Sequence, residues 1–315
     1  MLRAGARALI LLAGSVVRLE AAPAPTGLVV LVSGPPAAYR EAQDGVVSTL
    51  EASHAGPFRT ITLDDPANLE EARRTLAAGP SLVVAIGTRA AKLAMLEAPS
   101  APLVYAMVLD PASIGLPAPG SASAGQITGV AMDVTPDKQY GLMRSMVPGL
   151  RRIGVIYDPS VSGEAVRRAS AAAKLAGLTL VAQAVRSDAE VMGAAELIMP
   201  GVDLLWAIAD PTVLTEANAR ALILACLRAR KPLFAISEGY VRNGALAALS
   251  AHPLEVGRRA GEMTSAILLG APVRSYKPEL PPRVSLFLNQ ATARRLGLDL
   301  PQDILSRASV VYPRQ

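Results

Sequence analysis

The segment Arg152–Ser160, RIGVIYDPS, contains an apolar run that ends in Asp-Pro and leads into a helical pattern. The same arrangement occurs at three further places, Asp65-Pro66, Asp110-Pro111 and Asp210-Pro211. An aspartate before a helix accepts hydrogen bonds from the free backbone N–H groups of the first turn, and proline suits the first helical position because it lacks an N–H. Each pair therefore marks the carboxyl end of a predicted strand, where open α/β sheets bind their ligands.

Apolar β-rich runs alternate with patterns of helical spacing along the 315 residues. In the first half, strands are predicted at Leu28–Ser33, Phe58–Asp64, Leu82–Gly87 and Leu103–Val108. Helices are predicted between them at Ala37–Ser53, Ala67–Ala78 and Arg89–Glu97. The strands are almost continuously apolar, which is typical of parallel strands that helices cover on both faces.

A second series follows an irregular stretch rich in glycine and proline, Ile114–Gly125. Its predicted strands are Arg152–Tyr157, Leu178–Val185, Asp203–Ala209, Pro232–Ser237 and Gly244–Ser250. Its predicted helices are Ser160–Ala176, Ala189–Ile198 and Thr212–Arg230. A late helix at Pro253–Leu269 and a late strand at Val284–Asn289 are additional elements, which are best explained if the chain crosses back between two lobes. The sequence therefore predicts an α/β protein with two doubly wound parallel-sheet lobes, joined by a multi-strand hinge.

Residues 1–24 are typical of an export signal, because an arginine-containing start precedes the uncharged apolar run Ala8–Val17 and small residues follow. The run is too short to cross a bilayer of about 30 Å as a helix. A degenerate anchor or a misassigned start codon are the alternatives. With no cysteine near residue 20, a lipid anchor is not expected. We therefore expect an exported protein that is free in the periplasm.

The composition excludes several classes of function. A net charge of +5, scattered along the chain, does not indicate nucleic-acid binding. The single cysteine, Cys226, lies in a predicted helix and is interpreted as a small buried residue, not a nucleophile. His54 and His252 have no metal-ligand neighbour at helical spacing, and no nucleophile elbow, phosphate-binding loop or dinucleotide fingerprint occurs. The sequence thus favours a binding protein over an enzyme, without catalytic residues, metal or cofactor.

Small or polar residues at the predicted strand ends are the candidate ligand contacts. Gly87-Thr88 opens a helix whose free N–H groups suit a carboxylate, with simple capping by Thr88 as the alternative. Ser237-Glu238 offers a carboxylate to an ammonium or hydroxyl group. The aspartates of the Asp-Pro pairs are helix caps first and ligand contacts second. The candidate set is Ser33, Gly34, Gly87, Thr88, Asp110, Tyr157, Ser160, Asp210, Ser237 and Glu238.

Over nearly all of residues 27–312 the chain resembles the ABC-transporter substrate-binding proteins of the tryptophan/tyrosine-binding type. The segments that carry the resemblance are Val84–Thr88, Pro102–Leu116, Ile127–Val130, Arg152–Ser160, Lys231–Leu249 and Gly257–Gly270. The resemblance implies the type 1 periplasmic-binding-protein fold. It places residues 27–129 and 249–276 in lobe 1, and residues 130–248 and 277–315 in lobe 2. It also implies a cleft between the lobes, lined near Gly87, Thr88, Asp110, Tyr157, Ser160, Asp210, Ser237 and Glu238.

The resemblance further implies that a monomer captures a small polar organic solute, often an amino acid, by hinge closure. The solute is then delivered to an ABC transporter permease in the inner membrane. Gly34-Pro35-Pro36 replaces a polar loop of the family, and Asp210-Pro211-Thr212 stands where Asp-Asn-Thr is usual. Two other functions stay open at this point. One is a periplasmic sensor or accessory module that contacts a protein partner, and the other is an α/β enzyme with reactive groups on both sides of the cleft.

Overall fold

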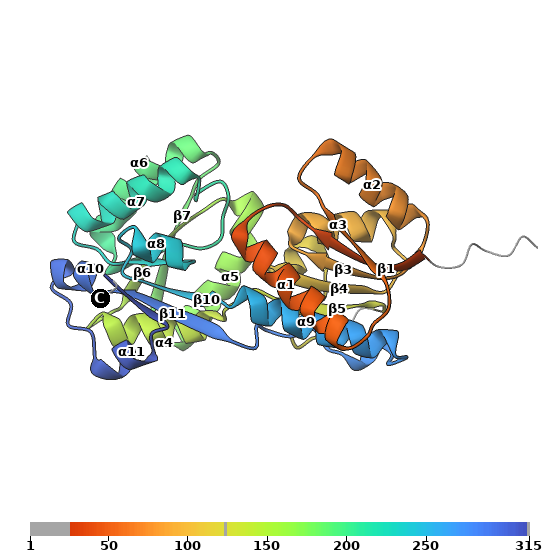
Figure 1. Cartoon of the computed structure of the whole chain (residues 1–315). Helices are drawn as coiled ribbons and strands as arrows, with labels where there is room; N and C mark the ends of the chain where they lie inside the picture. Colours follow the sequence, from red (N-terminus) through yellow and green to blue (C-terminus); the bar gives the residue numbers. More distant parts are fainter. Residues whose placement is uncertain (1–25, 123–124, 314–315) are drawn as a thin grey trace, which may run out of the picture.

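The computed structural model describes residues 26–122 and 125–313, so the predicted export signal at residues 1–24 lies outside the described residues. The described residues form two α/β lobes side by side (Figure 1). One lobe contains a five-stranded sheet of order β2-β1-β3-β4-β5, and the other a seven-stranded sheet of order β12-β11-β10-β9-β8-β6-β7. We call them lobe 1 and lobe 2. The predicted two-lobed α/β fold class is confirmed.

Lobe 1 is a parallel sheet with helices on both faces. Its strands are β1 (Thr26–Val32), β2 (Phe58–Thr62), β3 (Pro80–Ile86), β4 (Leu103–Val108) and β5 (Ile127–Ala131). Its helices are α1 (Ala37–Ala52), α2 (Pro66–Ala77), α3 (Thr88–Glu97) and the 3-10 helix η1 (Pro111–Ile114). The strand order reverses direction between β1 and β3, and ligands bind at such a point in doubly wound sheets.

Lobe 2 repeats this plan with more strands. Its strands are β6 (Arg152–Tyr157), β7 (Thr179–Ala184), β8 (Leu204–Trp206), β9 (Leu233–Ala235), β10 (Ala247–Ala251), β11 (Val284–Asn289) and β12 (Val310–Tyr312). Its helices are α4 (Pro136–Met146), α5 (Pro159–Leu175), α6 (Val191–Ile198), α7 (Glu216–Arg228), α8 (Glu238–Arg242), α10 (Gln290–Leu296) and α11 (Gln302–Arg307), with the 3-10 helices η2 (Asp188–Glu190) and η3 (Met199–Gly201). Strand β11 is antiparallel to β10, so this sheet is not wholly parallel as predicted. The chain reaches β11 from lobe 1 and not through a helical crossover within the sheet.

Helix α9 (Pro253–Leu268) follows lobe 2 in the sequence but packs on lobe 1, against α1. Glycines allow the two helices to approach closely. A Cβ atom at Gly257 would lie 1.9 Å from the carbonyl oxygen of Ala42, and one at Gly45 would lie 2.3 Å from that of Leu254. Within residues 125–313 the chain therefore crosses between the lobes three times, after β5, after β10 and after the 3-10 helix η4 (Val273–Ser275).

Strand pairing locates the first two crossings. Strand β5 pairs with lobe 1 through Ala131, and β10 pairs with lobe 2 through Ala251. The predicted boundaries at residues 129/130 and 248/249 fall inside these two strands. The division of the whole chain into lobes at those residues stays a prediction.

Two of the Asp-Pro pairs begin helices as predicted. Asp65 accepts a 2.8 Å hydrogen bond from the amide of Asn68 in α2, and Asp158 accepts one of 2.9 Å from the amide of Ser160 in α5. Asp110 precedes only the short η1 and makes no capping bond there. Asp210 precedes a turn, and α7 begins four residues later than predicted, after the cap residue Thr215. The Asp-Pro signature therefore marks a turn as readily as a helix.

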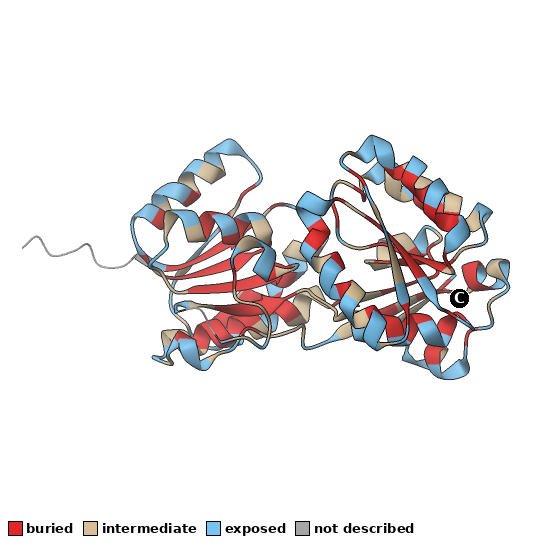
Figure 2. Ribbon diagram, turned by 180° about the vertical axis from the view of Figure 1, so that it is seen from behind, coloured by how far each residue is buried: buried red, intermediate tan, exposed pale blue. Residues whose placement is uncertain are grey.

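The central strands of both sheets and the helix faces turned toward them are buried, whereas the outer helix faces and much of the edge strands β2 and β7 are not (Figure 2). In lobe 1, α1 and α9 cover one face of the sheet, and α2 and α3 cover the other. The predicted burial of Cys226 is confirmed, because it lies on the buried face of α7, is 1% exposed and packs in a core cluster of lobe 2. None of the helices in residues 26–122 and 125–313 combines the length and apolar character needed to cross a membrane.

Candidate functional site

The carboxyl edge of lobe 1 brings Ser33 and Gly87 into contact. The Ser33 hydroxyl oxygen accepts a 2.9 Å hydrogen bond from the amide of Ala90, in the first turn of α3. Gly87 adopts φ +89°, and a Cβ atom there would lie 2.5 Å from the Ser33 Oγ. Helix α3 is therefore capped by a serine from a neighbouring strand, and the glycine provides the space for that serine.

This arrangement decides one alternative at Thr88. Gly87 takes the N-cap position and has no side chain, so capping by Thr88 is wrong. Thr88 is the first residue of α3 and is half-buried. Gly34 is buried next to the exposed Pro35. Contacts of Thr88 and Gly34 with an anionic ligand stay predictions.

Asp110 is the most strained of the candidate residues. It lies just beyond β4 with φ +45° and ψ +64°, a left-handed conformation that non-glycine residues rarely adopt. Its amide donates to both carboxylate oxygens of Asp133, at 3.2 and 3.1 Å. Burial raises the pKa of Asp133 to about 6, and the bond from the Asp110 amide offsets part of that rise.

The Asp110 side chain reaches the other lobe. Its Oδ1 accepts a 2.7 Å hydrogen bond from Nη2 of Arg168, which lies in the middle of α5. Arg168 also lies 3.5 Å from Glu164, one turn earlier in the same helix. Figure 1 shows α5 on the side of lobe 2 that faces lobe 1. Asp110 and Arg168 therefore form an ion pair between the lobes.

At the carboxyl edge of lobe 2, Asp210 is wholly buried. One of its carboxylate oxygens accepts a 2.8 Å hydrogen bond from the amide of Asp158, and the other accepts a 3.0 Å bond from the amide of Thr212. These bonds tie the end of β6 to the loop after β8. In this conformation Asp210 therefore supports the sheet edge, and a contact with ligand stays a prediction.

Ser160 belongs to the same network. Its amide and hydroxyl donate to Oδ1 of Asp158, at 2.9 and 2.7 Å, while Oδ2 accepts a 3.0 Å bond from the hydroxyl of Thr212. The two bonds from Ser160 hold the pKa of Asp158 below its usual range. Ser160 itself is exposed, and Tyr157 beside it is half-buried.

The remaining candidates, Ser237 and Glu238, open the short helix α8 and are both half-buried. Ser237 makes no side-chain capping bond. Glu238 accepts a hydrogen bond from the hydroxyl of Tyr312, which ends the C-terminal strand β12. The Glu238 carboxylate, which the sequence predicts to bind an ammonium or hydroxyl group of a ligand, is thus bonded to a residue near the C-terminus.

The structure therefore joins the candidates in separate groups: Ser33 with Gly87 in lobe 1, Ser160 with Asp210 through Asp158 in lobe 2, and Asp110 across the two. Sequence reasoning missed Asp133 and Arg168. Neither follows a strand–Asp-Pro signature, and the partner of each is far away in the sequence.

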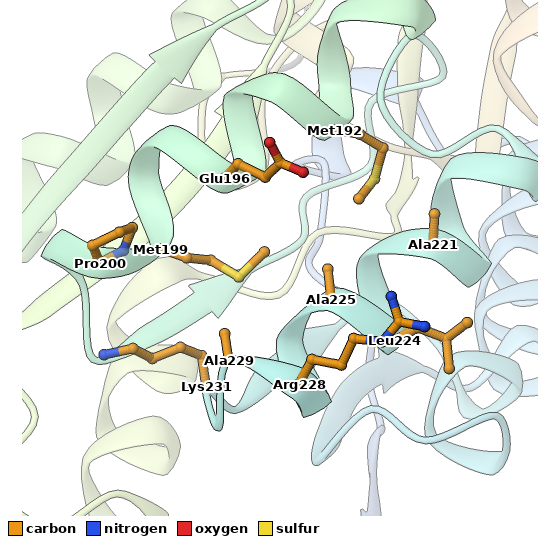
Figure 3. Close-up of a pocket in the computed structure, with 10 residues that line it drawn as sticks. All are labelled: Met192, Glu196, Met199, Pro200, Ala221, Leu224, Ala225, Arg228, Ala229 and Lys231. Carbon is orange, nitrogen blue, oxygen red and sulfur yellow. The ribbon is translucent and has the colours of Figure 1, made fainter.

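A hollow of about 630 Å³ lies elsewhere, between α6 and α7 on the outer side of lobe 2 (Figure 3). Met192 and Met199 project from one wall, and Leu224 and Arg228 from the other. None of the predicted ligand contacts lines it. Among the described residues, no group of three or more His, Cys, Asp and Glu side chains is placed to hold a metal ion.

The model of a family described as ABC transporter substrate binding protein matches residues 29–312. The chain belongs to the ABC transporter substrate-binding protein family. Its family and relatives are binding proteins and not enzymes, which confirms that part of the sequence prediction.

Individual relatives of this ABC transporter substrate-binding protein are distant. A tyrosine-binding protein of Clostridioides difficile (strain R20291) is 24% identical over 250 residues, covering 76% of this chain and 70% of the relative. An ABC domain from Streptococcus pneumonia in complex with L-Trp superposes with a TM-score of 0.74, at 23% identity, over 91% of this chain and 100% of the other. A ligand-free, open substrate-binding protein with adhesive properties from Clostridium difficile gives a TM-score of 0.76, at 20% identity, over 91% and 99%. The structural matches support the two-lobed fold.

Proposed function

We propose that this ABC transporter substrate-binding protein holds a small polar organic molecule, an amino acid in the first instance, between its two lobes. The supporting observation is that each lobe has polar residues at the carboxyl edge of its sheet, and that Asp110 at the edge of lobe 1 pairs with Arg168 in the middle of α5 of lobe 2. A solved relative has L-Trp bound and another is called tyrosine-binding, which favours an amino acid as the first class to test. Export to the periplasm and delivery to an inner-membrane permease complete the proposal.

In lobe 1, the start of α3 suits a carboxylate. The first turn of this helix carries partial positive charge, and the Ser33 hydroxyl takes up only the amide of Ala90, so the amides of Thr88 and Arg89 are the donors proposed for a ligand. The Thr88 hydroxyl adds a donor beside these groups. The ten candidates named from the sequence remain the proposed ligand contacts, with the half-buried Thr88 as the one that the local geometry favours most.

Hinge closure supplies the selectivity in this proposal. The three segments that cross between the lobes allow the lobes to change their angle while each sheet stays intact. A ligand that contacts both lobes stabilises the closed form, whereas one that contacts a single lobe equally in both forms shifts nothing. The protein therefore needs polar groups on both sides of the gap.

Thermal unfolding in the presence of amino acids and small carboxylates tests the proposal. A true ligand at 100 times its Kd should stabilise the protein by roughly 2.7 kcal/mol. Thr88→Val should weaken that effect, whereas Thr75→Val, whose hydroxyl bonds only within α2, should leave it unchanged. If no compound in either class raises the melting temperature, the proposal is contradicted.

A periplasmic sensor or accessory module is the second candidate. It is favoured by the fact that Asp210 and Glu238 already bond within the protein, which leaves fewer groups for a small ligand. A complex of the TorS sensor domain with TorT shares the fold at a TM-score of 0.51 and 15% identity. The same unfolding experiment separates the two, because a module that binds only a protein partner gains no stability from small molecules.

A further inference from the structure

Asp110 is held firmly on lobe 1. Its strained backbone is fixed from both sides, because its amide donates to Asp133 and its carbonyl oxygen accepts bonds of 3.0 and 2.7 Å from the amide and hydroxyl of Ser113. Strained residues of this kind persist only where their surroundings over-determine them. Asp133 lies two residues after the end of β5, at the start of the first crossing between the lobes. The carboxylate of Asp110 is therefore presented at the hinge in one orientation.

Arg168 is held on lobe 2 by different means. Glu164 lies one turn earlier in α5 and approaches the Arg168 Nη1 at 3.5 Å, which directs the guanidinium along the helix toward Asp110. The neighbouring Arg167 also pairs with Glu164 but stays within its own helix. The Asp110 side chain is 19% exposed and that of Arg168 is 47% exposed, so water screens the pair only in part.

We propose that Asp110 and Arg168 are positioning residues that hold the two lobes at their ligand-binding spacing. The pair forms only when the end of β4 and the middle of α5 are within hydrogen-bond distance, so it is a direct contact between two parts that the hinge moves. Its effect on affinity rests on the proposed function, whereas its effect on lobe spacing does not. Loss of the pair lowers the fraction of molecules in the binding-competent form, and the apparent Kd rises by the same factor.

The distance between the lobes can be measured with nitroxide labels at Leu96→Cys on α3 and Leu197→Cys on α6. Both leucines are exposed, at 73% and 71%, and the native Cys226 is buried and will not be labelled. Electron–electron resonance then gives the distance distribution of the full-length protein without ligand. Arg168→Gln removes the pair, Asp110→Asn removes it while keeping a residue that tolerates the left-handed backbone, and Arg167→Gln is the matched control.

We expect Arg168→Gln and Asp110→Asn each to broaden or shift the distribution, the double variant to match either single one, and Arg167→Gln to leave it unchanged. With the ligand found by thermal unfolding, we expect Kd to rise about two- to fivefold for the first two variants and not for the control. A distribution that is unchanged in Arg168→Gln overturns the inference even if ligand binds. A changed distribution in a protein that binds no small molecule leaves the inference standing and contradicts the proposed function instead.

Discussion

The two lobes share an architecture but use their strand ends differently. In lobe 2, Asp158 and Asp210 accept hydrogen bonds from amides and hydroxyls of their own lobe, so both carboxylates hold the sheet edge together. In lobe 1, Ser33 caps the start of α3 in the space that Gly87 leaves, and Asp110 reaches across to the other lobe. An aspartate after a strand can therefore close an edge or connect two lobes, and lobe 1 is the side on which ligand recognition should be sought first.

The largest loss of stability is expected at the carboxyl edge of lobe 2. Asp210→Ala leaves the buried amide of Asp158 and the amide of Thr212 without their acceptor, and we expect a loss of about 3–5 kcal/mol in the free energy of unfolding. Asp65→Ala, which removes one exposed helix cap, should cost only about 1 kcal/mol. Denaturant unfolding of both variants checks this, and equal losses would contradict the structural role of Asp210.

At the carboxyl edge of lobe 1, a substitution is expected to lower both the stability of the protein and its binding of ligand. Gly87→Ala adds a Cβ atom 2.5 Å from the Ser33 hydroxyl at a positive φ, so we expect a loss of about 2–3 kcal/mol together with loss of ligand stabilisation. Gly56→Ala is the control, because its φ is also positive but no atom lies within 4 Å of the added Cβ. It should cost about 1 kcal/mol and leave ligand stabilisation intact. Thermal unfolding with and without ligand separates the two variants.

Asp133 makes the edge of lobe 1 sensitive to pH. Its pKa is raised from 3.8 to about 6, so the folded protein binds more protons than the unfolded chain between these values, and stability falls as pH rises through them. Asp133→Asn removes the buried charge but keeps an acceptor for the Asp110 amide. We expect the free energy of unfolding of this variant to exceed that of the wild type by about 1–3 kcal/mol near pH 7.5. The difference should disappear below about pH 4. A gap that stays constant between those pH values would contradict this.

The smallest effect is expected at the far side of lobe 2. Tyr312→Phe removes the hydroxyl that donates to Glu238, and we expect a loss of about 1 kcal/mol in the free energy of unfolding. The variant also relieves Glu238 of this bond. If Glu238 contacts an ammonium group of the ligand, Kd should fall in Tyr312→Phe and rise in Glu238→Gln, as calorimetry with the identified ligand would measure. An unchanged Kd in both variants would remove Glu238 from the proposed site.

The strands were predictable because parallel strands covered on both faces are continuous apolar runs, as in β3 and β4. Other elements were not predicted. Helix α4 begins at Pro136 after the cap residue Thr135, a pair of the same kind as Asp-Pro that was overlooked, and β12 is only three residues long. At Asp210 the signal was present but ambiguous, because the same Asp-Pro pair that begins α5 begins a turn before α7.

Much of the candidate site could not be predicted from the sequence, because its contacts are not local. Ser33 was identified as a strand end, yet its role as the cap of α3 depends on β1 pairing with β3. Arg168 lies mid-helix among other charged residues and matters only because α5 faces the end of β4. Asp133 gains its raised pKa from burial beside Asp110, which no spacing in the sequence indicates. The sequence therefore showed which residue types lie at strand ends. Their hydrogen-bond and ion-pair partners could be identified only from the arrangement of the two lobes.

The glycine-mediated contact between α1 and α9 has a consequence for how the chain is assembled. Helix α9, which packs on α1 of lobe 1, is encoded after five of the seven strands of lobe 2. Until the ribosome has delivered residues through Leu268, the part of α1 that contacts α9, around Ala42 and Gly45, is uncovered. A nascent or truncated chain that stops before Pro253 should therefore be prone to aggregation and proteolysis, because lobe 1 cannot be completed until most of lobe 2 has been synthesised.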